Sequence, residues 1–229
     1  MSKSLFNSTA LRFWDEAEID FREYATKVLS RTVKETLLAI NPSFSFSRLE
    51  APCLAPANTV SNAYDENDIF ITNHMHSNQF FVLRPETTYS SYLWAKSLQK
   101  KLPLCVWQMA KSFRRETNDG ATASKMRFNE FYQLEFQCIY SRTTKADYRA
   151  SLIENVSKQL QKLCNKEIRI IESDRLPSYS LSTLDIEVKL DNNVWREIAS
   201  CSIRNDYSEE TYVAEIAIGM DRLVTIANS

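Results

Sequence analysis

The feature that most constrains the fold is an alternation of residue types between Phe128 and Cys138. Apolar and aromatic side chains dominate one set of alternate positions, and carboxylate and amide side chains dominate the other set. A period of two predicts a strand whose two faces meet different surroundings. One face can pack on helices, and the other presents polar groups around a single aromatic side chain, Phe131.

A second strand is predicted just before this one. An apolar run closes at residues 113–116 (Phe-Arg-Arg-Glu), and residues 117–125 carry the chain's first glycine among small and polar residues, which is typical of a loop. Arg114 and Glu116 fall on one face of the strand. The polar face formed by these two strands could hold a nucleotide, with the Phe131 ring stacked under the base and Arg114 on a phosphate. An ordinary hairpin with a charged, solvent-exposed face is the alternative.

Bulk properties favour one globular domain. The chain has 229 residues, of which 44% are hydrophobic and 25% charged. A chain of this length can bury about 70% of its unfolded surface. The net charge of −1 gives no global field for nucleic acid, so any such contact is expected to be local. Nothing resembles a signal peptide or a membrane span, which indicates a cytoplasmic protein without membrane contact.

Cysteine and glycine usage excludes several site types. The five cysteines are widely spaced, and neither of the two histidines, His74 and His76, lies near one in the sequence. Buried free thiols are therefore expected rather than a zinc site. Only two glycines are present, so the chain has no glycine-rich phosphate loop of the P-loop or dinucleotide-binding kind.

Periodicity outlines the remaining elements. Apolar residues at three- and four-residue steps predict a helix over residues 10–40, with Ser8 or Thr9 as its N-cap. A strand over residues 46–56 is interrupted by Pro52, which favours an edge position. Further helices are expected at residues 88–101 and 145–163, and strands at 69–72, 80–83, 168–171, 184–190, 194–202 and from 215. We expect a mixed α+β domain, with an antiparallel sheet of about six strands flanked by helices.

Three charged residues stand in positions that indicate ligand binding. Glu86 ends a predicted strand, where it could pair with a substrate ammonium group or cap the following helix. Glu197 shares its strand face with small residues, which leaves room for a ligand or a metal. Arg222 begins a short helix after Gly219, against the helix dipole, and this is better explained if it meets a polyphosphate.

Several short segments together resemble the class II aminoacyl-tRNA synthetases, and the glycyl enzymes in particular. Phe-Arg-x-Glu at residue 113, a loop, and Glu-Phe-x-Gln-x-Glu at residue 130 resemble motif 2. The segment from Glu215 to Arg222 resembles motif 3, and the helix at 10–40 followed by Pro52 resembles motif 1. Arg-Pro-Glu-Thr at 84–87 and the strand sequences at 185–187 and 195–198 also resemble family segments, and all of these segments occur along the chain in the same order as in the family.

The resemblance implies a class II synthetase-like antiparallel sheet and a role for each matching residue. Arg114 and Arg222 would be catalytic, the first holding the α-phosphate and the amino-acid carboxylate and the second the γ-phosphate. Phe131 would stack on adenine. Glu197 would coordinate Mg²⁺. The remaining implied contacts are ATP at Glu116, Arg127 and Ser200, and the amino acid at Glu86, Gln133, Glu135, Glu215 and Ala217.

The sequence also departs from the glycyl pattern. Ala217 replaces a serine of the amino-acid pocket, and Asn129 replaces an arginine before the Glu-Phe pair. Residues 197–202 (Glu-Ile-Ala-Ser-Cys-Ser) are similar to the seryl enzymes. Glycyl enzymes of this type continue into an anticodon-binding domain, so the expectation is one catalytic domain over residues 1–229 without that domain.

The activity implied by the resemblance is ATP- and Mg²⁺-dependent activation of a small amino acid, first of all glycine, with transfer to the acceptor end of tRNA. Two alternatives stay open. The chain could load an acceptor other than tRNA, or it could be a synthetase-derived accessory subunit without catalysis that binds nucleic acid. We also expect a symmetric homodimer formed through residues 10–56.

Overall fold

The computed structural model describes residues 11–57, 66–73, 80–115, 126–174, 176 and 178–228. In chain order the elements are α1 (Glu16–Ile40), β1 (Ser45–Arg48), β2 (Leu54–Pro56), a 3₁₀ turn (Glu66–Asp68), β3 (Ile71–Asn73), β4 (Phe80–Leu83), α2 (Thr88–Ser97), β5 (Leu104–Phe113), β6 (Glu130–Ser141), α3 (Tyr148–Cys164), β7 (Ile168–Glu172), β8 (Ser180–Lys189), β9 (Trp195–Arg204), β10 (Thr211–Gly219) and α4 (Met220–Ala227).

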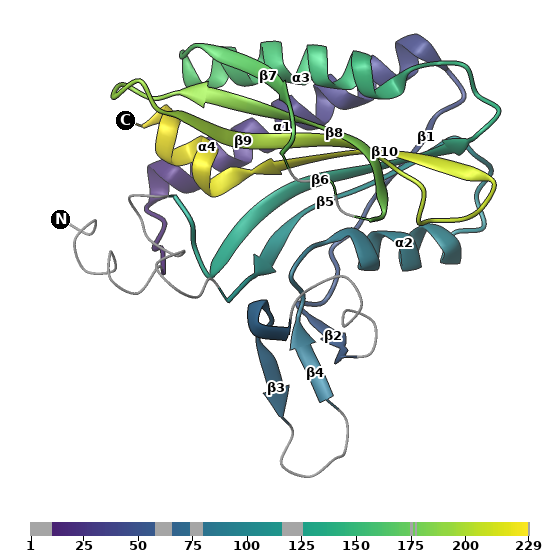
Figure 1. Ribbon diagram of the computed structural model, residues 1–229, viewed down its shortest axis with the longest axis horizontal. Helices are drawn as coiled ribbons and strands as arrows, with labels where there is room; N and C mark the ends of the chain where they lie inside the picture. The colour runs from purple at the N-terminus through teal and green to yellow at the C-terminus, as the bar shows by residue number, and fades with distance from the viewer. Residues whose placement is uncertain are drawn as a thin grey trace.

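One large sheet organises these elements (Figure 1). Its strand order is β1-β5-β6-β10-β9-β8-β7. The six strands from β5 to β7 pair antiparallel, which confirms the predicted sheet. β1 adds a seventh strand, parallel to β5, so the sheet is mixed. A separate small sheet has the order β2-β4-β3. The single strand predicted over residues 46–56 is thus divided into β1 and β2, which belong to different sheets, whereas β3 and β4 were predicted as separate strands.

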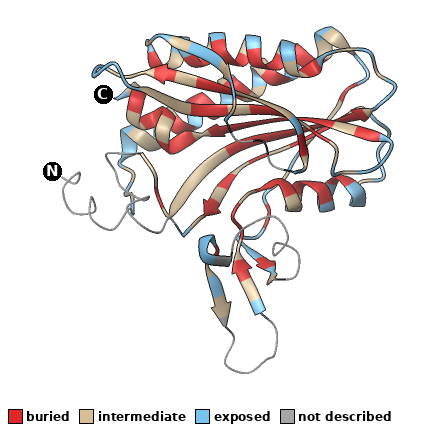
Figure 2. Cartoon of the chain, in the orientation of Figure 1, coloured by how far each residue is buried: buried red, intermediate tan, exposed pale blue. Residues whose placement is uncertain are grey.

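Helices cover the two faces of the large sheet unequally. Residues of α1, α3 and α4 pack together with the apolar side of β6, β9 and β10 in the main core. α2 lies on the opposite face, as Figure 1 shows, and packs on β5, β6 and β10 in a smaller cluster. Buried residues accordingly lie along the strands of the large sheet and on the helices that cover it (Figure 2). None of the described helices is long and apolar enough to cross a membrane.

The alternation in β6 divides its residues as predicted. Leu134, Phe136 and Cys138 are in the main core with the helices. Glu135 and Gln137 point to the other face, and each is at most 1% exposed. A carboxylate and an amide this deeply buried require partners, which come from α2 and the neighbouring strands.

The first helix begins later than predicted. Residues 11–15 are not helical, and Asp15 is the N-cap of α1, in a capping box with Glu18. The proposed caps, Ser8 and Thr9, lie outside the described residues. The reason for the late start is that the capping box satisfies the helix N-terminus, while the segment before it packs on α4 instead.

Other boundaries shift by a few residues. α2 ends at Ser97, earlier than the predicted 101, and Ser91, Tyr92 and Ala95 are among the residues of its buried face. α3 begins after its N-cap Asp147, three residues later than predicted. β8 and β10 begin earlier, and β9 runs on to Arg204. Pro52 falls between two strands that each lie at a sheet edge, as expected.

Candidate active site

A cavity of about 440 Å³ opens beside β6, β9, β10 and α4. The predicted site residues that line it are Arg114, Arg127, Phe131, Gln133, Glu197, Ser200, Ala217 and Arg222. The sheet register brings them together, because Gly219 is opposite Gln133 and Ala217 is opposite Ser200. Glu116 lies outside the described residues. The cavity therefore collects most of the residues expected to contact ATP.

Arg222 is fixed in the cavity wall by backbone oxygens. Its Nε donates to the carbonyl oxygen of Met126 at 3.2 Å, and its Nη1 donates to that of Glu197 at 2.9 Å. The Glu197 carboxylate lies 3.5 Å from Nη1. Arg222 is the third residue of α4, which has no side-chain hydrogen bond at its N-cap. The side chain is thus held by β9 and by the turn that precedes β6.

Arg114 reaches the same cavity from the end of β5. Its Nε donates to the carbonyl oxygen of Pro85 at 3.1 Å. Its guanidinium carbon lies 5.4 Å from the centre of the Phe131 ring. Cation and ring are therefore adjacent, as a site for a phosphate next to a base requires.

Arg84, which was given no role from the sequence, connects the segments around this part of the site. Its side chain is buried and donates to the carbonyl oxygens of Ala51 at 2.8 Å, Pro52 at 2.9 Å and Lys111 at 2.8 Å. It thereby ties the segment around Pro52 to the end of β5. A buried arginine with three backbone acceptors is a structural residue rather than a ligand-binding one.

The electrostatic field of the cavity is positive. Burial lowers the pKa of Arg222, Glu197 partly opposes that, and the charges of Arg127, Arg196 and Arg114 lower the pKa further. The charges of these arginines therefore lie close enough to Arg222 to repel it. A bound polyphosphate would reduce this repulsion, so the residues present fit ATP.

The carboxylate of Glu197 is the expected Mg²⁺ ligand. Among the described residues there is no group of three or more His, Cys, Asp or Glu side chains able to enclose a metal. Mg²⁺ is commonly held by one or two carboxylates together with substrate phosphates. A single carboxylate at the edge of a cationic cavity fits this shared mode, in which most ligands come from ATP and water.

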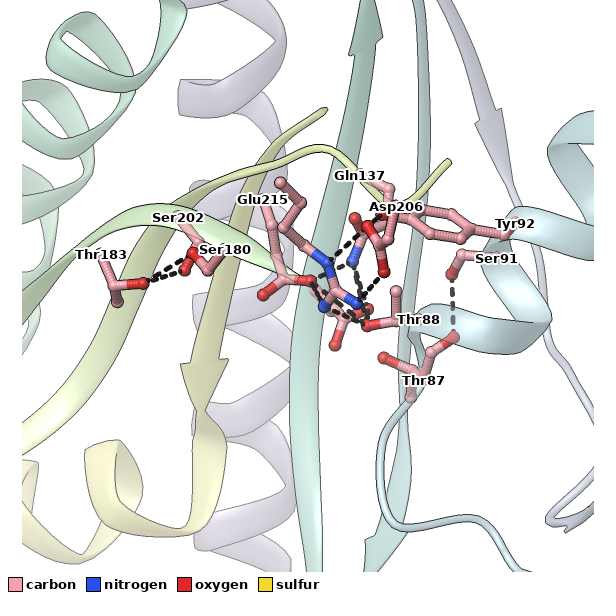
Figure 3. Close-up of polar contacts among 12 residues, drawn as sticks. Thr87, Thr88, Ser91, Tyr92, Gln137, Ser180, Thr183, Ser202, Asp206 and Glu215 are labelled. Carbon is pink, nitrogen blue, oxygen red and sulfur yellow. Dashed lines mark hydrogen bonds and ion pairs between the residues drawn. The ribbon is translucent and has the colours of Figure 1, made fainter. Parts of the chain in front are cut away.

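Two of the predicted ammonium-binding carboxylates, Glu135 and Glu215, belong to a buried polar network, of which Figure 3 labels Glu215, Gln137 and Thr88. Gln137 Nε2 donates to Glu135 Oε1 and to Glu215 Oε2, at 2.7 Å each. Thr88 Oγ1 is 3.1 Å and 3.2 Å from the same two oxygens. Ala217 is opposite Glu135 in the register and lines the cavity, so it joins the two regions.

Arg204, which the sequence analysis missed, supplies the cation of this network. Its Nη1 lies 2.6 Å from Glu215, its Nη2 lies 2.7 Å from Asp206, and its guanidinium stacks 3.9 Å from the ring centre of Tyr179. Burial acts to lower its pKa, but Glu215 and the hydrogen bond to Asp206 outweigh this and hold the pKa above its usual value. Arg204 lies two residues beyond the end of the strand predicted at 194–202, and strict alternation from Glu197 would have placed it on the opposite face, because the register shift between β8 and β9 at Ile186 and Glu187 does not show in the sequence.

Glu135 is a strongly perturbed acid of this buried network. Burial raises its pKa to about 8, and the charges of Glu215 and Glu86 add to the effect. Glu86 itself is half-buried after β4 and is not its helix's N-cap, which is Thr87. The three carboxylates are therefore close enough to interact, and a bound ammonium group would relieve their repulsion.

Replacing Glu135 with Gln should flatten the pH dependence of stability. The folded protein keeps a proton on Glu135 up to about pH 8, whereas an unperturbed carboxylate loses it near 4.5. The stability that this group contributes is therefore complete below the lower value and is lost as the pH rises through the higher one. Urea unfolding of parent and variant across this range measures it. Parallel curves would contradict the assignment, since Asp221, whose pKa is raised to about 7, is present in both proteins.

Residues 72–228 match the family described as tRNA synthetase class II core domain (G, H, P, S and T), and the match takes in more than half of the chain. The chain belongs to this family. The class II assignment made from the motifs is confirmed, and every residue that lines the cavity, apart from Asp68, falls within the matched residues.

Relatives of this class II core domain include glycine–tRNA ligases. The enzyme of Mesoplasma florum is 34% identical over 134 residues, which is 55% of this chain and 29% of that protein. The enzyme of Staphylococcus aureus is 33% identical over 144 residues, or 57% of this chain and 29% of that protein. The match thus takes in less than a third of the length of these relatives, and the resemblance to glycyl enzymes is confirmed.

Solved structures show the same fold. A Giardia lamblia prolyl-tRNA synthetase in complex with prolyl-adenylate has a TM-score of 0.69 at 18% identity, covering 90% of this chain and 46% of that one. A Cryptosporidium parvum prolyl-tRNA synthetase, complexed with halofuginone and AMPPNP, has a TM-score of 0.76 at 11% identity, covering 96% and 49%. The α+β fold of a class II synthetase core is therefore established for this chain.

Proposed function

We propose that the chain activates a small amino acid, glycine first of all, as an aminoacyl-adenylate and transfers it to the acceptor end of tRNA. The observation that carries this proposal is the presence of Arg114 and Arg222 in one cationic cavity, beside the buried carboxylates Glu135 and Glu215. An amino acid and ATP need these two environments side by side. The glycine–tRNA ligase relatives support the choice of amino acid.

The chemistry of the proposal is a displacement followed by an acyl transfer. A carboxylate oxygen of the amino acid attacks the α-phosphorus, a new P–O bond forms, and the bond to pyrophosphate breaks as pyrophosphate leaves with the electron pair. An acceptor hydroxyl then attacks the acyl carbon, loses its proton, and AMP leaves. Both steps depend mainly on positioning and on neutralising charge, so they need no strong catalytic base.

Each of the cavity residues would contact a different part of ATP. Arg114 would neutralise the α-phosphate and orient the amino-acid carboxylate, and Arg222 would hold the γ-phosphate. Phe131 would stack under adenine, and Arg127 would add a contact to ATP. Bound Mg²⁺ would neutralise phosphate charge, with Glu197 as its protein ligand and Ser200 nearby. The amino-acid ammonium group would meet Glu86, Glu135 and Glu215, close to Gln133 and Ala217.

Exchange of labelled pyrophosphate into ATP, run with each of the twenty amino acids, tests the activation step. We expect exchange with glycine first and weaker exchange with alanine or serine. Preference for an aromatic or cationic amino acid would contradict the glycine assignment. Exchange without charging of total tRNA would favour another acceptor. No exchange with any amino acid would favour a non-catalytic accessory role, and binding of RNA would then be measured directly.

Replacing Ala217 with Ser should sharpen the preference for glycine. The hydroxyl adds a polar contact and a little bulk at a residue that lines the cavity opposite Glu135. Adding or removing one methyl-sized group in such a pocket shifts binding by about 1–3 kcal/mol. The ratio of kcat/KM for glycine over alanine in the exchange reaction measures the effect. An unchanged or smaller ratio would place Ala217 outside the amino-acid pocket.

We also propose that the protein is a dimer formed through residues 10–56. A groove between α1 and the sheet edge has Phe46, Trp107 and Phe136 among its apolar lining residues and Lys27 and Arg31 among its charged ones. In the described part of the chain, β1 is an edge strand of the large sheet. An apolar groove beside an edge strand is a surface that a second copy could cover.

Light scattering at micromolar concentration should give twice the 26.5 kDa of one chain. Replacing Tyr24, which is 58% exposed on α1, with Asp should shift the mass towards one chain, because it places a charge on the proposed interface. Lys158 to Ala, on the surface of α3, is the matched control. A parent protein with the mass of one chain would contradict the dimer.

A further inference from the structure

The segment before α1 crosses the beginning of α4. Arg12 Nη1 donates to the backbone carbonyl oxygen of Asp221 at 2.6 Å and to Thr225 Oγ1 at 2.6 Å. Thr225 Oγ1 donates in turn to the same carbonyl oxygen at 2.7 Å. One guanidinium group therefore holds two successive turns of α4 from a part of the chain more than two hundred residues earlier.

Arg12 is itself anchored on α1. Its Nη2 forms an ion pair with Glu18 Oε1 at 2.9 Å, and its side chain is 10% exposed. Glu18 is fixed by the capping box, in which its Oε2 accepts from the backbone N–H of Asp15 and its own N–H donates to Asp15 Oδ1. The guanidinium carbon also lies 4.2 Å from the centre of the Trp14 ring. The two helix N-termini are thus joined by a rigid connection.

This connection ends next to a residue of the site. Arg222 follows Asp221 directly, and its side chain lines the cavity. The N-cap of α4, Gly219, makes no side-chain hydrogen bond, so the first turn has no cap of its own. A cation near the N-terminus of a helix opposes the helix dipole, which reduces what Arg12 adds to the stability of α4. Arg12 therefore matters less for the stability of α4 than for the position in which it holds the first turn of that helix.

We propose that Arg12 is a positioning residue for Arg222. It holds the first turn of α4 so that Arg222 points into the cavity towards the far phosphates of ATP. The inference rests on the proposed function for the identity of the ligand. It assigns to the segment before α1 a part in ATP binding, although Arg12 does not line the cavity.

Calorimetric titration with ATP and Mg²⁺, together with pyrophosphate exchange, tests the proposal. Arg12 to Ala should weaken ATP affinity about tenfold, in the range of couplings between residues that share a partner. KM for glycine and kcat at saturating ATP should stay near the parent values. Arg12 to Lys should restore only part of the affinity, because a single ammonium group cannot reproduce the planar fork. Lys158 to Ala, an exposed residue of α3, should match the parent.

A double variant separates positioning from general destabilisation. If Arg12 acts through Arg222, adding Arg12 to Ala to an Arg222 to Ala protein should change ATP affinity less than twofold, because the residue that is positioned has gone. Full tenfold losses in both backgrounds would overturn the proposal. An equal rise in KM for ATP and glycine would overturn it as well.

Crystal structures of the parent and of Arg12 to Ala make the test independent of activity. The proposal expects the 2.9 Å contact between Arg222 Nη1 and the Glu197 carbonyl oxygen to be lost or lengthened in the variant. An unmoved Arg222 would overturn it even if the variant bound ATP poorly. If the parent catalyses no exchange, the proposed function fails, while the position of Arg222 still decides the role of Arg12.

Discussion

Replacing Arg114 with Ala is expected to slow adenylate formation about 10²–10³-fold, the usual loss when one preorganised donor to a developing charge is removed. The side chain is held by the Pro85 carbonyl oxygen and lies against Phe131, so it is oriented before the substrates arrive. Such a group stabilises the transition state more than the ground state. The loss should therefore appear in kcat of pyrophosphate exchange, with a smaller change in KM for ATP.

Arg222 to Ala provides the matched comparison for this prediction. A contact to the γ-phosphate is expected to be similar in ground and transition states, so this variant should mainly raise KM for ATP. Arg169 to Ala is a suitable control, because Arg169 stacks on Trp195 and pairs with Glu187 without lining the cavity. Parent-like exchange by both cavity variants would show that the roles implied by the family resemblance are wrong.

The sequence predicts those elements whose structure follows from the residue pattern of a single segment. The alternation around Phe131 fixes which side chains of β6 face the helices, because strand periodicity needs no knowledge of partners. The segment from Glu215 to Arg222 is likewise read as a strand, a glycine and a helix, and β10 and α4 have this order. Residues within such segments reach the same cavity once the strands pair.

Contacts between distant segments could not be predicted in this way. Thr88 and Glu215 are 127 positions apart, and Thr88 and Arg204 are 116 apart. These contacts exist because β6, β10 and β9 are neighbours in the sheet and α2 covers that face. The strands were predicted, but their order was not. Arg204 and Arg12 were therefore missed, although Arg204 is buried, the Arg12 side chain is only 10% exposed, and both have several partners.

Loss of Arg204 should lower the stability of the fold substantially. Replacing it with Met would leave Glu215, which is 9% exposed, without its cation and beside Glu135. Breaking a buried ion pair by removing one partner typically costs about 3–5 kcal/mol. For a domain of this size that corresponds to a fall in Tm of roughly 6–20 °C. Urea unfolding and thermal scans of parent and variant measure the two quantities.

A second substitution distinguishes the lost charge pair from lost packing. Glu215 to Gln alone should be milder than Arg204 to Met, because Arg204 keeps its pairing with Asp206 at 2.7 Å. In the double variant, Arg204 to Met with Glu215 to Gln, no uncompensated carboxylate remains at position 215, so about half or more of the lost stability should return. If the double variant is as unstable as the sum of the two single ones, the cost lies in the packing of Arg204 against Tyr179, 3.9 Å from its ring centre, and not in the charge pair.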